Sequence, residues 1–88
     1  MIKYSAIKFY LSDEDQPIIM TGLRHAEILE KMFSLGLKYD SNRMVQGFLN
    51  SEDKFLDRRD AKFEARFCNQ LIEDTGYGEL FSEDMWPE

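Results

Sequence analysis

The chain is poor in the residues on which many enzymes and cross-linked proteins depend. Its 88 residues include one cysteine and one histidine, and no Walker, GxSxG or HExxH spacing occurs. A disulfide needs two cysteines, as does a CxxC metal or redox motif, so the single Cys68 indicates a reducing compartment. We therefore expect a protein that is not an enzyme and that uses neither a metal nor a cofactor.

Basic charge and long apolar runs are also scarce. The net charge is −6, from 11 basic and 17 acidic residues, whereas a protein that binds polymeric nucleic acid usually carries a basic stripe. No apolar run approaches the roughly 20 residues that cross a bilayer. Lys3 and Lys8 interrupt an N-terminal segment that has no signal-peptide cleavage site. The expected location is the cytoplasm, with neither nucleic acid nor membrane as a partner.

What is present suffices for one small core. Hydrophobic residues make up 43% of the chain and aromatic residues 14%, which is typical of a folded domain rather than a disordered segment. No linker or internal repeat divides the sequence, so residues 1–88 are expected to form a single domain. A domain of this length buries only about 60–65% of its unfolded surface, which favours a homo-oligomer.

Alternating apolar and aromatic residues predict strands. Residues 2–11 are predicted to form a strand that turns in a polar loop and returns at 18–20 as a hairpin. A later strand is expected at 44–49, where Gly47 is typical of a bulge or a close backbone approach. A short strand at 54–56 would pair with it.

Capping residues and apolar spacing predict two helices. Thr21 is a suitable N-cap and Gly36 a suitable C′ residue for the first, which carries an apolar stripe. Asp57 would cap the second, with Asp60 three residues on in an arrangement like a capping box. The sequence thus predicts an α+β fold: a small antiparallel sheet, made of the N-terminal hairpin and one or two later strands, packed by two main helices.

The apolar face of the second helix is wider than one packing partner needs. Its stripe consists of Ala61, Ala65, Cys68 and Ile72. Leu71, Phe67 and Phe63 widen this stripe on one side, and two of them are aromatic. Either another subunit or the C-terminal tail would cover these two rings, and the sequence does not separate the two possibilities.

Cations at the heads of both helices indicate a site for an anion. Arg24 lies in a first turn, where a cation opposes the helix macrodipole, so it should have a carboxylate or a ligand anion as a partner. Arg58 repeats this pattern at the second helix, where Lys54 and the backbone N–H groups could hold a phosphate or a carboxylate. The alternative is that Arg58 pairs with Glu83 or Asp84 and so ties the tail to the body.

Other polar and aromatic residues could complete such a site. His25 lies on an apolar helix face, where a lone histidine is more often a hydrogen-bonded core residue than a ligand contact. Gln46 and residues 82–84 could bind the polar edge of a ligand, although the latter also suit a simple helix start. Phe48 or Trp86 would offer a stacking face, although each ring alone is more often part of a core.

The order and spacing of these segments resemble those of a family of small phage and prophage proteins. Its pattern runs from an Arg-His pair through Gln-Gly-Phe and Arg-Phe-Val-Asp-Arg-Glu-Glu-Ala segments to a closing Ser-Glu-Asp-Leu-Trp or -Tyr. The matching residues here are Arg24-His25, Gln46-Gly47-Phe48, Lys54 to Ala61, and Ser82-Glu83-Asp84-Met85-Trp86. The chain departs at Lys54, which lacks the planar fork of arginine, and at Arg59-Asp60, which replaces two glutamates.

Small phage accessory proteins often blunt host defence, so the resemblance implies that role without a mechanism. The leading hypothesis is a non-catalytic protein in the host cytoplasm that sequesters a small anionic, nucleotide-like signal, completed by homo-oligomerisation. The expected ligand contacts are Arg24, His25, Lys54 and Arg58 for the anion, Gln46, Ser82, Glu83 and Asp84 for the polar edge, and Phe48 or Trp86 for stacking. Two alternatives stay open: an acidic inhibitor that docks on a host defence protein, and a minor hydrolase acting through His25 and Glu83.

Overall fold

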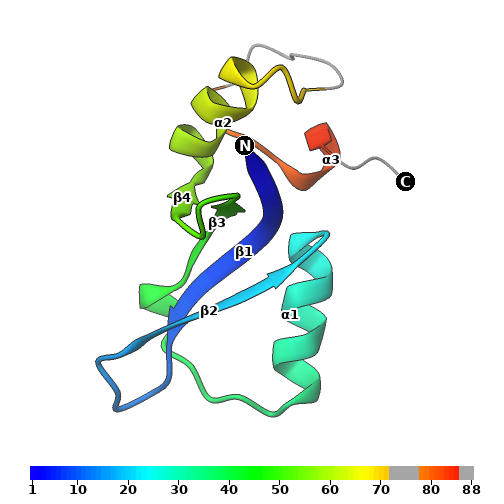
Figure 1. Ribbon diagram of the computed structural model, residues 1–88. Coiled ribbons are helices and arrows are strands. Elements are labelled where there is room, and N and C mark those ends of the chain that lie inside the picture. The colour runs from blue at the N-terminus through cyan, green and yellow to red at the C-terminus, as the bar shows by residue number, and fades with distance from the viewer. Residues whose placement is uncertain (72–77, 86–88) are drawn as a thin grey trace.

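The computed structural model, described for residues 1–71 and 78–85, has a four-stranded antiparallel sheet in the order β2-β1-β3-β4. The strands are β1 (Ile2–Tyr10), β2 (Pro17–Gly22), β3 (Val45–Asn50) and β4 (Phe55–Asp57). Two main helices, α1 (His25–Ser34) and α2 (Arg58–Phe67), and the short α3 (Ser82–Met85) complete the arrangement in Figure 1. The predicted α+β fold, with an antiparallel sheet packed by two main helices, is confirmed.

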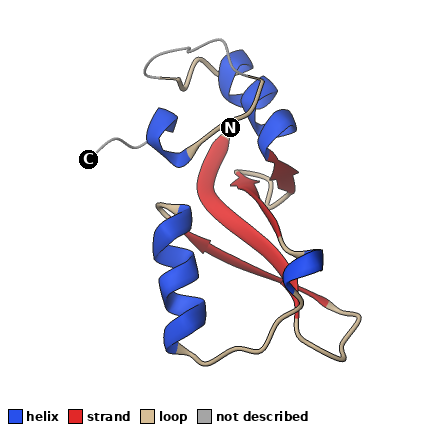
Figure 2. Ribbon diagram, turned by 180° about the vertical axis from the view of Figure 1, so that it is seen from behind, coloured by secondary structure: helices blue, strands red, loops and turns tan. Residues whose placement is uncertain are grey.

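The helices pack against one face of the sheet. Side chains alternate between the faces of a strand, and Ile7 and Phe9 of β1 are fully buried, whereas Tyr4 on the opposite face is 40% exposed. Ile28 and Met32 of α1 pack against Ile7 and Phe9. The α2 and α3 helices cover the N-terminal end of β1, so Figures 1 and 2 show α1 and the α2–α3 pair toward opposite ends of that strand.

The first helix begins later than the sequence predicts. Thr21, the predicted N-cap, lies in β2 opposite Ala6, because the β1–β2 ladder continues to Gly22. Arg24 is the N-cap instead, and its side chain makes no capping hydrogen bond. The predicted end of the helix is confirmed, since Gly36 has a φ of 65° and donates its N–H to the carbonyl of Phe33. One 3₁₀ turn, η1 (Ser41–Arg43), follows before β3.

The second helix begins as predicted and ends earlier. The Asp57 carboxylate accepts the backbone N–H of Asp60 at 2.8 Å, which confirms the cap. The helix ends at Phe67 because Asn69 adopts a φ of 60° and the N–H of Gln70 returns to the carbonyl of Ala65. The predicted apolar stripe therefore keeps its two buried alanines, while Cys68 is the half-buried C-cap. Ile72 lies outside the described residues.

Candidate functional site

The C-terminal segment returns to the sheet and brings distant parts of the sequence together. Leu80, Ser82 and Met85 are buried, and Leu80 shares a core cluster with Phe48 and Ala61. Figure 2 shows α3 close to the N-terminal end of β1 and to the first turn of α1. Groups separated by more than fifty residues in sequence therefore meet beneath the sheet.

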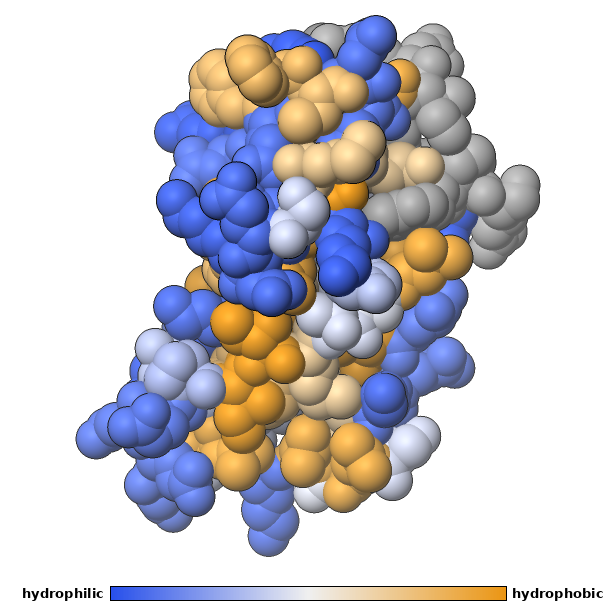
Figure 3. All heavy atoms as spheres, in the orientation of Figure 1, coloured by the Kyte–Doolittle hydropathy of each residue, from blue (hydrophilic) through white to orange (hydrophobic). Residues whose placement is uncertain are grey.

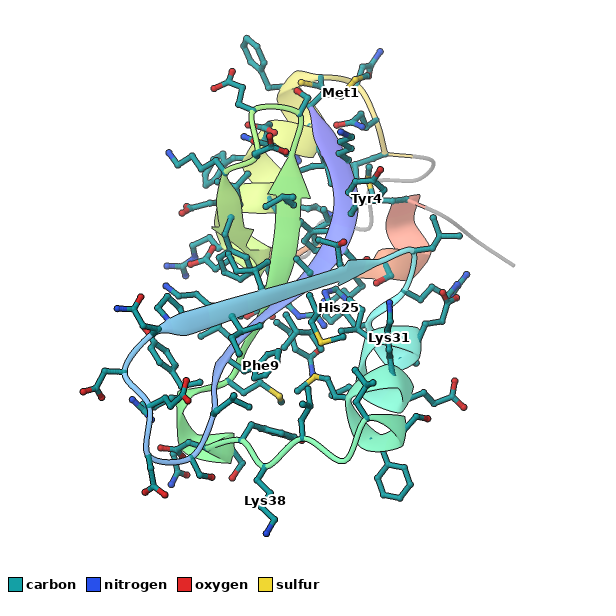
Figure 4. The ribbon with its side chains drawn as sticks, turned by 60° about the horizontal axis from the view of Figure 1, so that its bottom comes forward. Met1, Tyr4, Phe9, His25, Lys31 and Lys38 are labelled. Carbon is teal, nitrogen blue, oxygen red and sulfur yellow. The ribbon has the colours of Figure 1, made fainter. Side chains whose placement is uncertain are left out.

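Ser82 joins α1 and β1 through buried hydrogen bonds. Its hydroxyl lies 2.7 Å from Nδ1 of His25 and 2.8 Å from the hydroxyl of Ser5, and it accepts the backbone N–H of His25 at 3.3 Å. Nε2 of His25 lies 2.7 Å from the carbonyl oxygen of Gly47. Because a carbonyl can only accept, Nε2 carries a proton. His25 lies inside the molecule in Figure 4 and is 7% exposed, and Ser82 is 2% exposed. The hydrogen-bonded pair therefore connects α1, β1 and α3 in the interior and does not face an open cleft.

The Gln46-Gly47-Phe48 segment of β3 packs against the His25–Ser82 pair. A Cβ atom at Gly47 would overlap the carbonyl oxygen of Leu56 on β4 and would lie 2.7 Å from the ring of Phe55. The close backbone approach predicted at Gly47 is thus confirmed. Phe48 is fully buried, and its ring meets that of His25 edge-on, with 5.0 Å between their centroids. Substitution of the glycine would therefore disturb both the β3–β4 ladder and the acceptor of the histidine.

Arg58 fastens the C-terminal segment from α2. Its Nη1 donates to the carbonyl of Leu80 at 2.7 Å and its Nη2 donates to Oε1 of Gln46 at 2.6 Å. The backbone N–H of Leu80 donates in turn to the carbonyl of Arg58 at 2.9 Å. The guanidinium also lies over the ring of Phe81, 4.8 Å from its centroid. Arg58 therefore ties the tail to the body through a backbone carbonyl.

A hollow lies beside the Arg58 clamp, which we define as the hydrogen bonds of Arg58 to Leu80 and Gln46, and Arg59 lines this hollow. Its main cavity has a volume of about 440 Å³ and is lined by Arg59, Gly78, Glu79 and Phe81. A smaller cavity of about 340 Å³ shares two of these residues and is lined by Gln46, Asp57, Arg58, Arg59 and Glu79. Arg59 is exposed, and within residues 1–71 and 78–85 it has no hydrogen-bond or ion-pair partner. The hollow thus combines cations, carboxylates and an aromatic ring in one place.

Among the side chains that the structure describes, five of the predicted site residues form two groups of direct contacts. Gln46 bonds to Arg58, and His25 contacts both Phe48 and Ser82. Of these five, His25, Phe48 and Ser82 are buried, so in this conformation they offer almost no surface to a ligand. Gln46 and Arg58 are half-buried and line the smaller cavity.

Of the other predicted residues, the structure describes the side chains of Lys54 and Arg24. Lys54 is in the turn opposite Asn50, about 13 Å along β3 from Gln46. Arg24 is half-buried at the N-cap of α1. Trp86 lies outside the described residues, as do the side chains of Glu83 and Asp84.

Sequence reasoning did not assign Arg59, Glu79 or Phe81 of the hollow to the site. Arg59 was recognisable, because it is a second cation in the first turn of α2, where the same argument about the macrodipole identified Arg58. Glu79 and Phe81 had no such indication, since their position depends on how an irregular segment docks onto the folded body.

The part of the chain that the structure describes has neither a metal-binding cluster nor a membrane-spanning helix. There, no three histidine, cysteine, aspartate or glutamate side chains lie close enough to hold a metal ion. None of the helices traced over the same residues combines the length and apolar character needed to span a bilayer.

Comparison with known proteins identifies the family. The family model described as Phage T4 y16D protein matches residues 1–86. The chain therefore belongs to the phage T4 y16D protein family. No curated protein and no solved structure gives a significant match.

Proposed function

We propose that this member of the phage T4 y16D family is a non-catalytic accessory protein that binds a small anionic, nucleotide-like molecule. By sequestering such a molecule in the host cytoplasm it would silence a host defence signal. One observation carries the proposal, namely the hollow beside the first turn of α2. There Arg59 has no partner among the described residues, and the ring of Phe81 forms part of the wall.

Each lining group suits a different part of a nucleotide-like molecule. The Arg59 guanidinium would bind a phosphate through paired N–H donors, and the positive end of α2 adds to the field there. The Glu79 carboxylate would accept hydrogen bonds from ribose hydroxyls or base N–H groups. Phe81, which is 40% exposed, would stack on a base. Because Asp57 and Glu79 balance the charges of the two arginines in the hollow, we expect a ligand with few phosphates instead of a long polyphosphate.

A thermal-shift screen tests this proposal. The panel contains cyclic nucleotides, nucleotide sugars and ADP-ribose derivatives, and a ligand of the folded state raises the melting temperature by mass action. Arg59→Ala should abolish the shift. Lys31→Ala, which removes an exposed cation from α1, should leave it intact. A panel without any shift, or a shift that survives Arg59→Ala, would count against the hollow as the ligand site.

A second candidate is an acidic inhibitor that docks directly on a host defence protein. Asp13, Glu14 and Asp15 are exposed together in the β1–β2 turn, and the net charge of −6 suits a basic partner. Salt-sensitive retention of a stoichiometric host protein, lost when these three acids become amides, would favour this candidate. It would be favoured most strongly if no nucleotide raises the melting temperature.

A further inference from the structure

The outer face of α2 projects two phenylalanine side chains into solvent. Phe63 and Phe67 are 67% and 92% exposed and lie one turn apart on the same side of the helix. They border a cavity of about 680 Å³ that extends to Leu56 on the edge strand β4. Figure 3 shows apolar side chains gathered over this α2 end of the molecule. Exposed aromatic side chains in such a patch are typical anchors of protein interfaces.

Charges of opposite sign flank this aromatic stripe. Each residue advances a helix by about 100°, which puts Arg59 and Arg66 on one side of the stripe and Asp60 on the other. Arg59 and Asp60 are both exposed, and neither side chain has a hydrogen-bond or ion-pair partner in the described segments. The face therefore has one basic edge and one acidic edge, with aromatic rings between them.

We propose that this face binds a second copy of the chain, with the two α2 helices parallel about a two-fold axis. In that orientation the basic edge of each helix meets the acidic edge of its partner, as in parallel coiled coils. Arg59 then faces Asp60 of the partner copy at nearly the same height, because the two positions differ by one rise of about 1.5 Å. An antiparallel pair would instead bring like edges together.

The charge pattern is what selects a second copy as the occupant. A partner must offer an apolar surface between two edges of opposite charge, and the face of α2 satisfies this requirement itself. The patch is small beside the roughly 800 Å² per partner of a standard interface, so the dimer should be weak and concentration-dependent. The aromatic contacts of this interface do not involve the proposed ligand site, since Phe63 and Phe67 do not line the hollow, whereas Arg59 belongs to both surfaces.

Sedimentation velocity between about 10 µM and about 1 mM tests the proposal. The wild-type chain should pass from monomer to dimer, and the double substitution of Phe63→Ser with Phe67→Ser should weaken association about tenfold or more. Phe33→Ser is the matched control, because this ring is 88% exposed but lies on α1. It should leave the dimer unchanged.

A charge swap tests the orientation. Arg59→Asp and Asp60→Arg should each weaken the dimer several-fold, since each places like charges across the two-fold axis. The double variant restores opposite charges and should recover wild-type association. Urea unfolding of each variant confirms that the monomer is folded. A wild-type chain that stays monomeric, or a serine double variant that still dimerises, would overturn the proposal. Failure of the double charge swap to recover association would overturn the parallel arrangement.

Discussion

Arg58→Ala gives a quantitative test of how the C-terminal segment is held. The substitution removes two hydrogen bonds from a charged donor, to the carbonyl of Leu80 and to Gln46, at 2.7 and 2.6 Å. Such bonds contribute about 1.5–3 kcal/mol each, and a partly exposed guanidinium belongs at the low end. The contact with the ring of Phe81 adds about 0.5 kcal/mol. We expect a loss of about 3 kcal/mol, a large part of the roughly 4–13 kcal/mol typical of this length.

Urea unfolding and hydrogen exchange measure this loss in two ways. The urea midpoint should fall, because the free energy of unfolding decreases. The amide of Leu80, which donates to the carbonyl of Arg58, should exchange faster because its segment undocks more often. Arg58→Lys keeps the charge but cannot bond both acceptors in one plane, so it should recover less than half of the loss.

The neighbouring residue supplies the control. Arg59→Ala removes the same side chain one position along α2, where it has no hydrogen-bond or ion-pair partner among the residues described, and it should not lower the urea midpoint. If Arg58→Ala and Arg59→Ala have equal free energies of unfolding, Arg58 does not hold the C-terminal segment in place.

Three further changes test other parts of the structure. Ser82→Ala should lower the free energy of unfolding, measured in urea, by about 1–3 kcal/mol. The reason is that His25 and Ser5 would each lose a buried hydrogen-bond partner. Gly47→Ala should cost about 2–3 kcal/mol and broaden amide NMR signals along β3 and β4, because the added Cβ overlaps the carbonyl of Leu56. The hydrogen bond to Glu64 raises the pKa of the Met1 amino group above 8.0. The contribution of this interaction to the free energy of unfolding is therefore complete below that pH, and it is lost as the pH rises through the folded-state pKa of the amino group. In Glu64→Gln, the free energy of unfolding measured in urea should no longer show this decrease at alkaline pH.

Local chemistry made much of the fold predictable. The cap at Asp57 and the end of α1 at Gly36 depend on groups within a few residues, and the alternation in β1 reflects a single covered face. The start of α1 was not predictable in the same way. Thr21 has the side chain of a good cap, but its backbone pairs with Ala6, and the continuation of that ladder outweighs a capping preference.

The candidate site shows the same division. The polar groups led to the hypothesis that distant segments converge, but they did not indicate which groups would bond to one another. Ser82 and His25 are 57 positions apart, and nothing local predicts that they bury each other. The sequence left open whether Phe48 stacks on a ligand or belongs to the core. Phe48 lies opposite Ser5 on the covered face of the sheet and is fully buried, so it belongs to the core.

The two arginines at the head of α2 also predict a trade-off between stability and function. A cation in the first turn of a helix opposes the macrodipole and costs about 0.3–1 kcal/mol. For Arg58 the bonds to Leu80 and Gln46 offset this cost. For Arg59 no described group does so, so the position is unfavourable for folding alone. Arg59→Ala should therefore raise the free energy of unfolding by a few tenths of a kcal/mol, while it abolishes ligand binding and weakens self-association. A variant that loses stability would show instead that Arg59 is held by the fold, and the argument for its role in binding would fail.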